Sequence, residues 1–154
     1  YSMAYTMKMG RKADGKGDYT ICKLECLYWT ADGKALDPNK MEEWNWRLMI
    51  RTPKIVGSFP ITDDDLQIAR TRLEERKKAE GCERVVLHHL KAARFVQMLH
   101  VGPYDKEMET IDQMLEYCEV NGLKHYRAHH EIYISDPRRV KPEKLKTILR
   151  LLVE

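Results

Sequence analysis

The stretch "ARFVQMLHVGPYDKEMETIDQMLEYCEVNG", residues 93–122, contains the two kinds of element from which the chain is built. Its opening predicts a strand over 93–101, which ends at a Gly-Pro-Tyr turn. Apolar residues then recur at helical spacing from Met108 to Cys118, and they predict a helix over 106–121 that ends at the following glycine. Strand and helix therefore alternate closely in this half of the chain.

The same order of elements occurs twice. After the helix, strands are predicted over 129–135 and 146–153, so the second half reads strand, helix, strand, strand. The first half gives the same unit without its opening strand. A helix joins the two halves, and it is indicated by Thr62 as its cap and by aspartates in its first turn. The elements expected in the first half and the connection are a helix over 1–10, strands over 18–29 and 44–51, and the connecting helix over 63–80.

Two β-α-β-β modules in tandem predict an α+β fold, with an antiparallel sheet that has helices on one side and a ligand cleft on the other. At 154 residues the chain suits a single domain. Its expected parts are a first module over 1–60 that lacks its opening strand, a connecting helix and linker over 61–92, and a second module over 93–154.

Composition narrows the class of protein. The hydrophobic fraction of 43% and charged fraction of 33% are typical of a soluble globular protein. No apolar run approaches the ~20 residues that span a bilayer, and no signal segment opens the sequence, so a cytoplasmic protein without membrane contact is expected. The net charge is only +3, and basic residues alternate with acidic ones, which argues against direct nucleic-acid binding.

Side-chain alternation assigns the carboxylates to faces of the sheet. In the strand over 129–135, Ile132 is expected to face the helix over 106–121, which leaves Glu131 and Tyr133 on the other face. The strand over 18–29 is expected to place Glu25 opposite its helix in the same way. The face with the acids could simply be exposed to solvent, as in many antiparallel sheets, or it could line a small-molecule pocket.

Metal binding is not predicted from the sequence. Cys22 and Cys26 would lie about 13 Å apart along one strand face, which is too far for thiolates that share one zinc ion. They are interpreted as reduced core thiols, because no secretory signal is present. Alternation leaves only His129 beside Glu131, and one imidazole with one carboxylate does not make a ligand set. No metal and no cofactor are therefore expected.

Several stretches resemble the GyrI-like small-molecule-binding family. The second half, "FVQMLHVGPYDKEMETIDQMLEYCEVNGL" and "HHEIYISDPRRVKPEKLKTILR", is similar to the C-terminal half of that family. The segments "DYTICKLECLYW" and "RLMIRTP" resemble its single-domain members. Two departures are visible, because the family normally begins with a strand before its first helix, and its stand-alone members tend to have glycine where this sequence has Cys26.

The resemblance implies a tandem of two modules around a cleft with a buried acid, which matches Glu131. Some stand-alone relatives hydrolyse cyclopropane-bearing DNA-alkylating natural products, so the implied ligand is a hydrophobic or aromatic small molecule. A negative group among aromatic rings also favours a cationic or proton-accepting ligand. Glu131 would activate water and Tyr133 would donate to the developing oxyanion. The expected ligand-binding residues are Glu25, Trp29, Tyr104, Trp46 and Tyr5.

Two alternatives to hydrolysis stay open at this point. The same cleft could belong to a non-catalytic domain that sequesters a drug or senses an effector, and a binder would saturate where a hydrolase consumes its ligand. Protein binding, as in the gyrase inhibitors of the family, is a weaker possibility. The oligomeric state is not predicted.

Overall fold

The computed structural model describes residues 1–33 and 36–154 and divides them into two compact units. The first unit contains Tyr1–Cys22 and Ile50–Lys91, and the second contains Lys23–Met49 and Ala92–Glu154. Each unit is described by itself below. Within the described ranges, no helix combines the length and the apolar character needed to cross a membrane.

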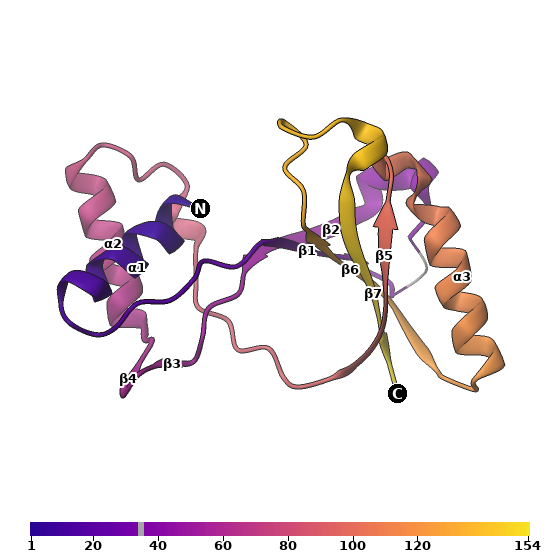
Figure 1. The fold of residues 1–154 in the computed structure, drawn as a ribbon, viewed down its shortest axis with the longest axis horizontal. Helices are drawn as coiled ribbons and strands as arrows, with labels where there is room; N and C mark the ends of the chain where they lie inside the picture. The colour runs from indigo at the N-terminus through magenta and orange to yellow at the C-terminus, as the bar shows by residue number, and fades with distance from the viewer. Residues whose placement is uncertain (34–35) are drawn as a thin grey trace. The chain divides into compact units, whose positions relative to one another are not determined.

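The second unit is built on an antiparallel five-stranded sheet in the order β2-β1-β6-β7-β5 (Figure 1). β6 is the central strand and pairs with β1 on one side and β7 on the other. The expected α+β fold with an antiparallel sheet is thereby confirmed. The strands of this sheet are β1 (Leu24–Thr30), β2 (Trp44–Ile50), β5 (Arg94–Val101), β6 (His125–Tyr133) and β7 (Lys146–Val153).

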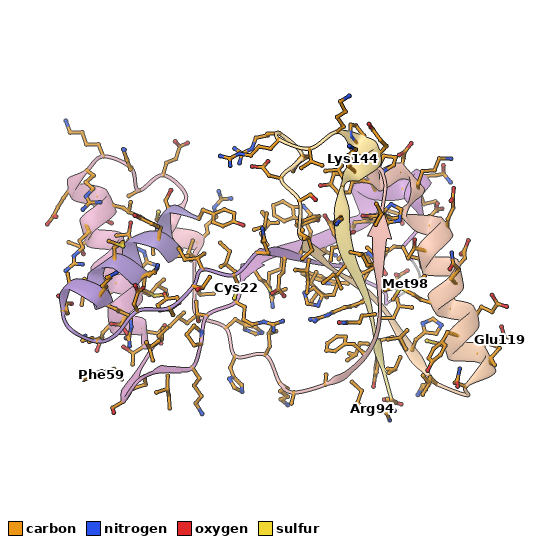
Figure 2. The ribbon with its side chains drawn as sticks, in the orientation of Figure 1. Cys22, Phe59, Arg94, Met98, Glu119 and Lys144 are labelled. Carbon is orange, nitrogen blue, oxygen red and sulfur yellow. The ribbon has the colours of Figure 1, made fainter. Side chains whose placement is uncertain are left out.

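One face of this sheet is covered by α3 (Glu107–Val120), which runs alongside β5 (Figure 1). Glu119 lies on the side of α3 that points away from the sheet (Figure 2). The buried core consists of Met114 and Cys118 from α3 packed on alternate residues of β7. Those alternate residues are Leu149, Leu151 and Val153.

The structure corrects the predicted faces of β6. Glu131 pairs with Leu149 of β7, and paired residues of antiparallel strands share a face, so Glu131 lies on the face that α3 covers. The expectation that Ile132 would face this helix is wrong. Both faces of β6 carry apolar and polar residues, so alternation alone could not decide which face is covered. The strict burial of every second residue in β7 is the clearer signal.

The first unit contains α1 (Ser2–Ala13) packed against α2 (Asp63–Glu75). A two-stranded ribbon of β3 (Ile55–Val56) and β4 (Phe59–Pro60) precedes α2. The core of this unit is apolar and comes mainly from the facing sides of the two helices. Its buried members are Met3, Met7, Leu66, Ala69, Leu73 and Cys82.

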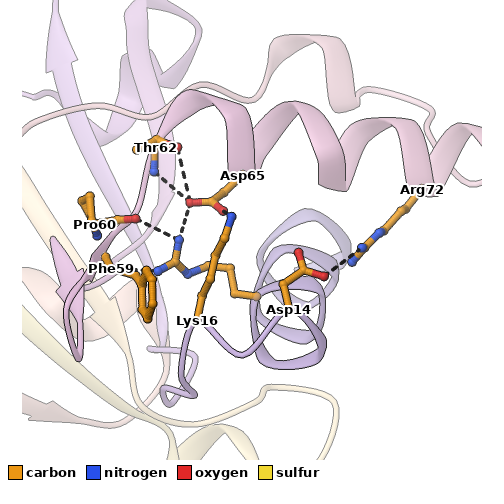
Figure 3. A network of polar contacts seen from close by, with 8 residues as sticks. Asp14, Lys16, Phe59, Pro60, Thr62, Asp65 and Arg72 are labelled. Carbon is orange, nitrogen blue, oxygen red and sulfur yellow. Dashed lines mark hydrogen bonds and ion pairs between the residues drawn. The ribbon is translucent and has the colours of Figure 1, made fainter.

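Buried Arg11 ties α1 to the start of α2, where its partners Phe59, Pro60 and Asp65 lie close together (Figure 3). Arg11 donates hydrogen bonds to the backbone carbonyls of Pro60 and Phe59, each at 2.9 Å, and forms an ion pair with Asp65. Asp65 also accepts a hydrogen bond from the backbone N–H of Thr62 at 3.0 Å and so completes a capping box with it. The predicted cap at Thr62 is confirmed.

Several element ends differ from the predicted ones. α1 continues to Ala13, beyond the predicted end at residue 10, and β6 ends at Tyr133 instead of residue 135. β1 begins at Leu24, so Cys22 precedes the strand, and both Cys22 and Cys26 are free thiols. α2 ends at Glu75, because Lys77 adopts a left-handed conformation (φ 54°) that a helix cannot continue through. β6 begins earlier than expected, at His125, with an irregular register before His129. Short 3-10 helices lie at Pro38–Glu43, Cys82–Arg84, Tyr104–Lys106 and Pro142–Lys144.

Candidate functional site

The candidate site is centred on Glu131, which lies in the middle of the sheet. Its neighbours across the strands are Cys26 on β1 and Leu149 on β7. Only 8% of Glu131 is exposed. A carboxylate at such a position loses most of its hydration, so the groups packed around it decide what it can do.

A second carboxyl group comes from the first turn of α3. Glu107 is 7% exposed and lies beside Glu131 and Thr147. Burial, followed by the negative charge of Glu131, raises the pKa of Glu107 to about 8. Glu107 therefore holds a proton at neutral pH more often than not, and the pair then carries one negative charge.

The third polar group is His129, which precedes Glu131 by two residues and shares its face. His129 is 7% exposed, and its Nε2 lies 3.1 Å from Oε1 of Glu131. This approach is a close polar contact without the geometry of a hydrogen bond, and neither ring nitrogen has a hydrogen-bond partner among the described residues. Glu107, His129 and Glu131 each offer one ligating atom, and these atoms all lie within 4.8 Å of one another.

Two phenols complete the polar part of the site. The hydroxyls of Tyr28 and Tyr133 are 2.9 Å apart, and Tyr133 is also hydrogen-bonded to Glu131. Burial, followed by the charge of Glu131, raises the pKa of Tyr133, and burial raises that of Tyr28. Both phenols keep their protons at physiological pH and can act as hydrogen-bond donors.

Aromatic rings surround these polar groups. Tyr104 meets Tyr133 edge-on at 6.1 Å between ring centroids, and Trp44 meets Tyr28 in the same way at 5.8 Å. The ring of His129 stacks on Tyr28 at 6.5 Å. Tyr104 is exposed and Tyr133 is half-buried, so the group extends from the buried acids to the protein surface. Aromatic walls with few convergent polar groups are typical of small-molecule sites.

Residues 49–154 match the GyrI-like small molecule binding domain. The chain belongs to this family. It is 35% identical to an uncharacterized conserved protein from Listeria innocua, whose crystal structure it matches with a TM-score of 0.88 over 100% of this chain and 76% of that one.

Two further crystal structures from the same organism are described as hydrolases. One is 36% identical to this GyrI-like chain, with a TM-score of 0.84 over 100% of this chain and 76% of that one. The other is 34% identical, with a TM-score of 0.82 over 100% of this chain and 75% of that one. Among curated proteins, none matches the chain.

The predicted site residues of this GyrI-like domain are only partly brought together. Tyr104 and Tyr133 lie with Glu131, as described above. Glu25 and Trp29 do not, because Cys26 rather than Glu25 pairs with Glu131, which puts Glu25 and Trp29 on the opposite face of the sheet. Their predicted placement beside Glu131 is wrong, since a shift of one residue in register exchanges the faces of a whole strand.

The residues on the opposite face have partners of their own. Glu25 accepts a hydrogen bond from Nε2 of His130 at 2.9 Å, and the guanidinium of Arg47 lies 5.7 Å from the ring centroid of Trp29. Trp46 on β2 is 61% exposed, and Tyr5 on α1 belongs to the first unit. The ligand-binding roles of Trp46 and Tyr5 stay predictions.

Sequence reasoning missed Glu107 and Tyr28. An acid in the first turn of a helix is ordinary, because it complements the helix dipole, so Glu107 carried no distinct signal. Tyr28 is adjacent to Trp29 in the sequence, and the wrong face was chosen for that strand. The sequence leaves Trp44 and Trp46 as alternative aromatic residues of the site, and the contact with Tyr28 favours Trp44.

Proposed function

We propose that this GyrI-like domain binds hydrophobic aromatic small molecules, cationic ones among them, at Glu131 and hydrolyses cyclopropane-bearing DNA-alkylating compounds by adding water to them. The observation that carries the proposal is the hydrogen-bonded series from Glu131 to Tyr133 to Tyr28 at the centre of an aromatic group. The two hydrolase neighbours at 36% and 34% identity support the catalytic part of the proposal.

Binding follows from the surroundings of the acid. The rings of Tyr28, Trp44 and Tyr104 offer flat apolar surfaces against which an aromatic compound can stack. The negative charge shared by the Glu107–Glu131 pair attracts a positive group on the ligand, and nearby ring faces add to that attraction. The ligand class is therefore a flat, hydrophobic molecule with positive charge or with a polar edge that can approach Glu131.

The reaction uses groups already in contact. Glu131 takes a proton from water as the water oxygen bonds to a cyclopropane carbon of the ligand. A carbon–carbon bond of the ring breaks, and its electron pair moves through the conjugated dienone to the carbonyl oxygen. Tyr133 gives its hydroxyl proton to that oxygen, and Glu131 returns the proton from water to Tyr133 through their hydrogen bond. The net change is the addition of one water, and both side chains are restored.

Few catalytic groups are needed for such a step. Ring strain and conjugation already lower the barrier, so the protein contributes a positioned base, a donor at the developing oxyanion and a fixed orientation of the ligand. A non-catalytic binding domain is the second candidate, favoured by the exposed Tyr104 ring at the rim of the aromatic group. The two functions differ in turnover.

The test is mass spectrometry of a duocarmycin-type cyclopropane compound after incubation with the protein. The wild type is expected to convert many equivalents to a product heavier by one water, and Glu131→Gln is expected to abolish the conversion. Glu25→Gln, which changes an equally buried carboxylate on the opposite face, is the matched control and should retain it. Unchanged compound that still binds the wild type would establish the binding domain instead.

A further inference from the structure

We propose that Glu107, His129 and Glu131 form a binding site for a divalent transition-metal cation, for which Zn²⁺ is the best match. The site joins one residue of α3 to two residues of β6. The proposal goes beyond the proposed hydrolysis and does not depend on it, because it rests only on the arrangement of the three side chains.

The distances suit a single ion. One ligating atom of each residue lies within 4.8 Å of the other two. Zinc bonds to imidazole nitrogen and carboxylate oxygen are about 2.0–2.2 Å long, so in tetrahedral geometry two ligands of one ion lie about 3.3–3.6 Å apart. Side-chain rotations that move these atoms by less than about an ångström would therefore close the site, with no change in the backbone of α3 or β6.

Unsatisfied polar atoms point independently to an ion at this position. Both ring nitrogens of His129 lack a hydrogen-bond partner among the described residues, although the side chain is more than nine-tenths buried. Oε1 of Glu107 is also buried without such a partner. Buried polar atoms are almost always satisfied in native proteins, and an ion is one of the recognised reasons for an exception.

Charge favours the same interpretation. Glu107 and Glu131 are buried side by side, with ligating oxygens within 4.8 Å of each other. A cation between two buried carboxyl groups would offset the cost of removing their charge from water. A mixed set of one imidazole and two carboxylates suits Zn²⁺ and similar ions better than Mg²⁺ or Ca²⁺, which favour oxygen ligands throughout. Three protein ligands leave a further position open.

The chain also contains a near-copy of this group that lacks the third ligand. Glu25 and His130 form a buried pair on the opposite face of the sheet, with Nε2 of His130 2.9 Å from Oε2 of Glu25. In the described parts of the chain, Glu107, His129 and Glu131 are the only three such residues whose ligating atoms come this close. The pair of Glu25 and His130 is therefore a matched internal control.

Metal binding would also bear on the proposed reaction. A Glu131 carboxylate bound to a cation would be a weaker base toward water, so Zn²⁺ should slow the proposed hydrolysis of the ligand. This consequence rests on the proposed function, whereas the metal site itself does not.

The experiment is a titration of the chelator-treated full chain with ZnCl₂ against a chromogenic zinc indicator, without any organic ligand. One equivalent of Zn²⁺ is expected to bind to the wild type. Glu107→Gln and His129→Gln are expected to weaken binding at least tenfold, while Glu25→Gln and His130→Gln leave it unchanged. Circular dichroism of each variant confirms that it is folded before the titration is interpreted.

Cobalt supplies a second readout that loss of folding could not imitate. Co²⁺ in the wild-type site should give weak visible d–d bands without a sulfur-to-cobalt charge-transfer band, because Cys26 on the same face is not among the proposed ligands. Absence of Zn²⁺ binding, equal binding by all five proteins, or a thiolate signature would each overturn the proposal. Because no cyclopropane compound is present, failure here is distinct from failure of the proposed hydrolysis.

Discussion

The carboxyl group of Glu107, at the start of α3, lies against that of Glu131, in the central strand of the sheet, and both residues are buried. Two acids in such contact oppose each other's ionisation, and proteins generally avoid this arrangement unless it serves a site. α3 covers a sheet face that is apolar along β7 and carries the polar Glu131 on β6. The helix therefore contributes apolar core residues and the second acid, Glu107, to the same face.

Removal of the buried charge of Glu131 should make the fold more stable. Glu131→Gln keeps the shape of the side chain but removes the negative charge that, together with burial, forces Glu107 to hold a proton at neutral pH, so the free energy of unfolding should rise by about 0.5–2 kcal/mol. Thermal unfolding at neutral pH measures the change. Glu25→Gln should act in the opposite direction, because it weakens a hydrogen bond to His130. Equal destabilisation by both substitutions would contradict the prediction.

Tyr133→Phe should separate chemistry from binding. The substitution removes the proposed donor to the developing oxyanion and leaves the ring that meets Tyr104. We expect the rate of water addition in a single turnover to fall by about 10²–10³, as when one oxyanion donor is removed, while the affinity for the compound changes only a few-fold.

Tyr28→Phe supplies the comparison for that experiment. Tyr28 contacts Tyr133 through its hydroxyl at 2.9 Å but has no part in the proposed proton transfers, so a smaller decrease in rate is expected. A Tyr133→Phe variant with the wild-type rate would exclude this hydroxyl as the donor.

Two leucine substitutions test which sheet face carries the core. Leu149 is fully buried beneath α3, so Leu149→Ala should reduce the free energy of unfolding by about 2–5 kcal/mol, the range for large-to-small core changes. Leu99 on β5 is 50% exposed, so Leu99→Ala should cost less than about 1 kcal/mol. Urea unfolding of both variants gives the two values. A larger effect at Leu99 would place the core on the other face.

Much of this fold could be predicted from periodicity and family resemblance. Helical spacing from Met108 to Cys118 located α3, and the strand-forming runs located β5 and β7 to within a residue. Those signals are local, because each depends on neighbours a few positions apart in one segment. The acid and phenol at Glu131 and Tyr133 were recognisable for the same reason.

The composition of the site depends on contacts that are distant in the sequence. Whether Glu25 or Cys26 pairs with Glu131 is a question of register, and both choices fit the alternation of β1. Glu107 joins the site only because α3 packs on the Glu131 face. Short-range patterns carry no information on either point, so these residues became visible only in the folded chain.

The last prediction concerns pH and the first unit. Burial opposes ionisation of Asp65, but the N–H of Thr62 and the charge of Arg11 outweigh it and hold the pKa of Asp65 below its usual value. A carboxyl with a lower pKa in the folded state stabilises the fold above its unfolded pKa of about 3.9. That contribution is lost as the pH falls from there through the folded pKa.

Asp65→Asn should therefore reduce the free energy of unfolding of the first unit at neutral pH. In this variant, the free energy of unfolding should also fall less steeply as the pH decreases. The loss should be about 3–5 kcal/mol, because Arg11 would be left as a buried charge without its carboxylate. Asp14→Asn is the control, since Asp14 and Arg72 form an exposed pair at 3.8 Å (Figure 3) that should contribute less than about 1 kcal/mol. Urea unfolding from pH 7 down to about pH 3 measures both variants, and an unchanged acid slope in Asp65→Asn would contradict the assignment.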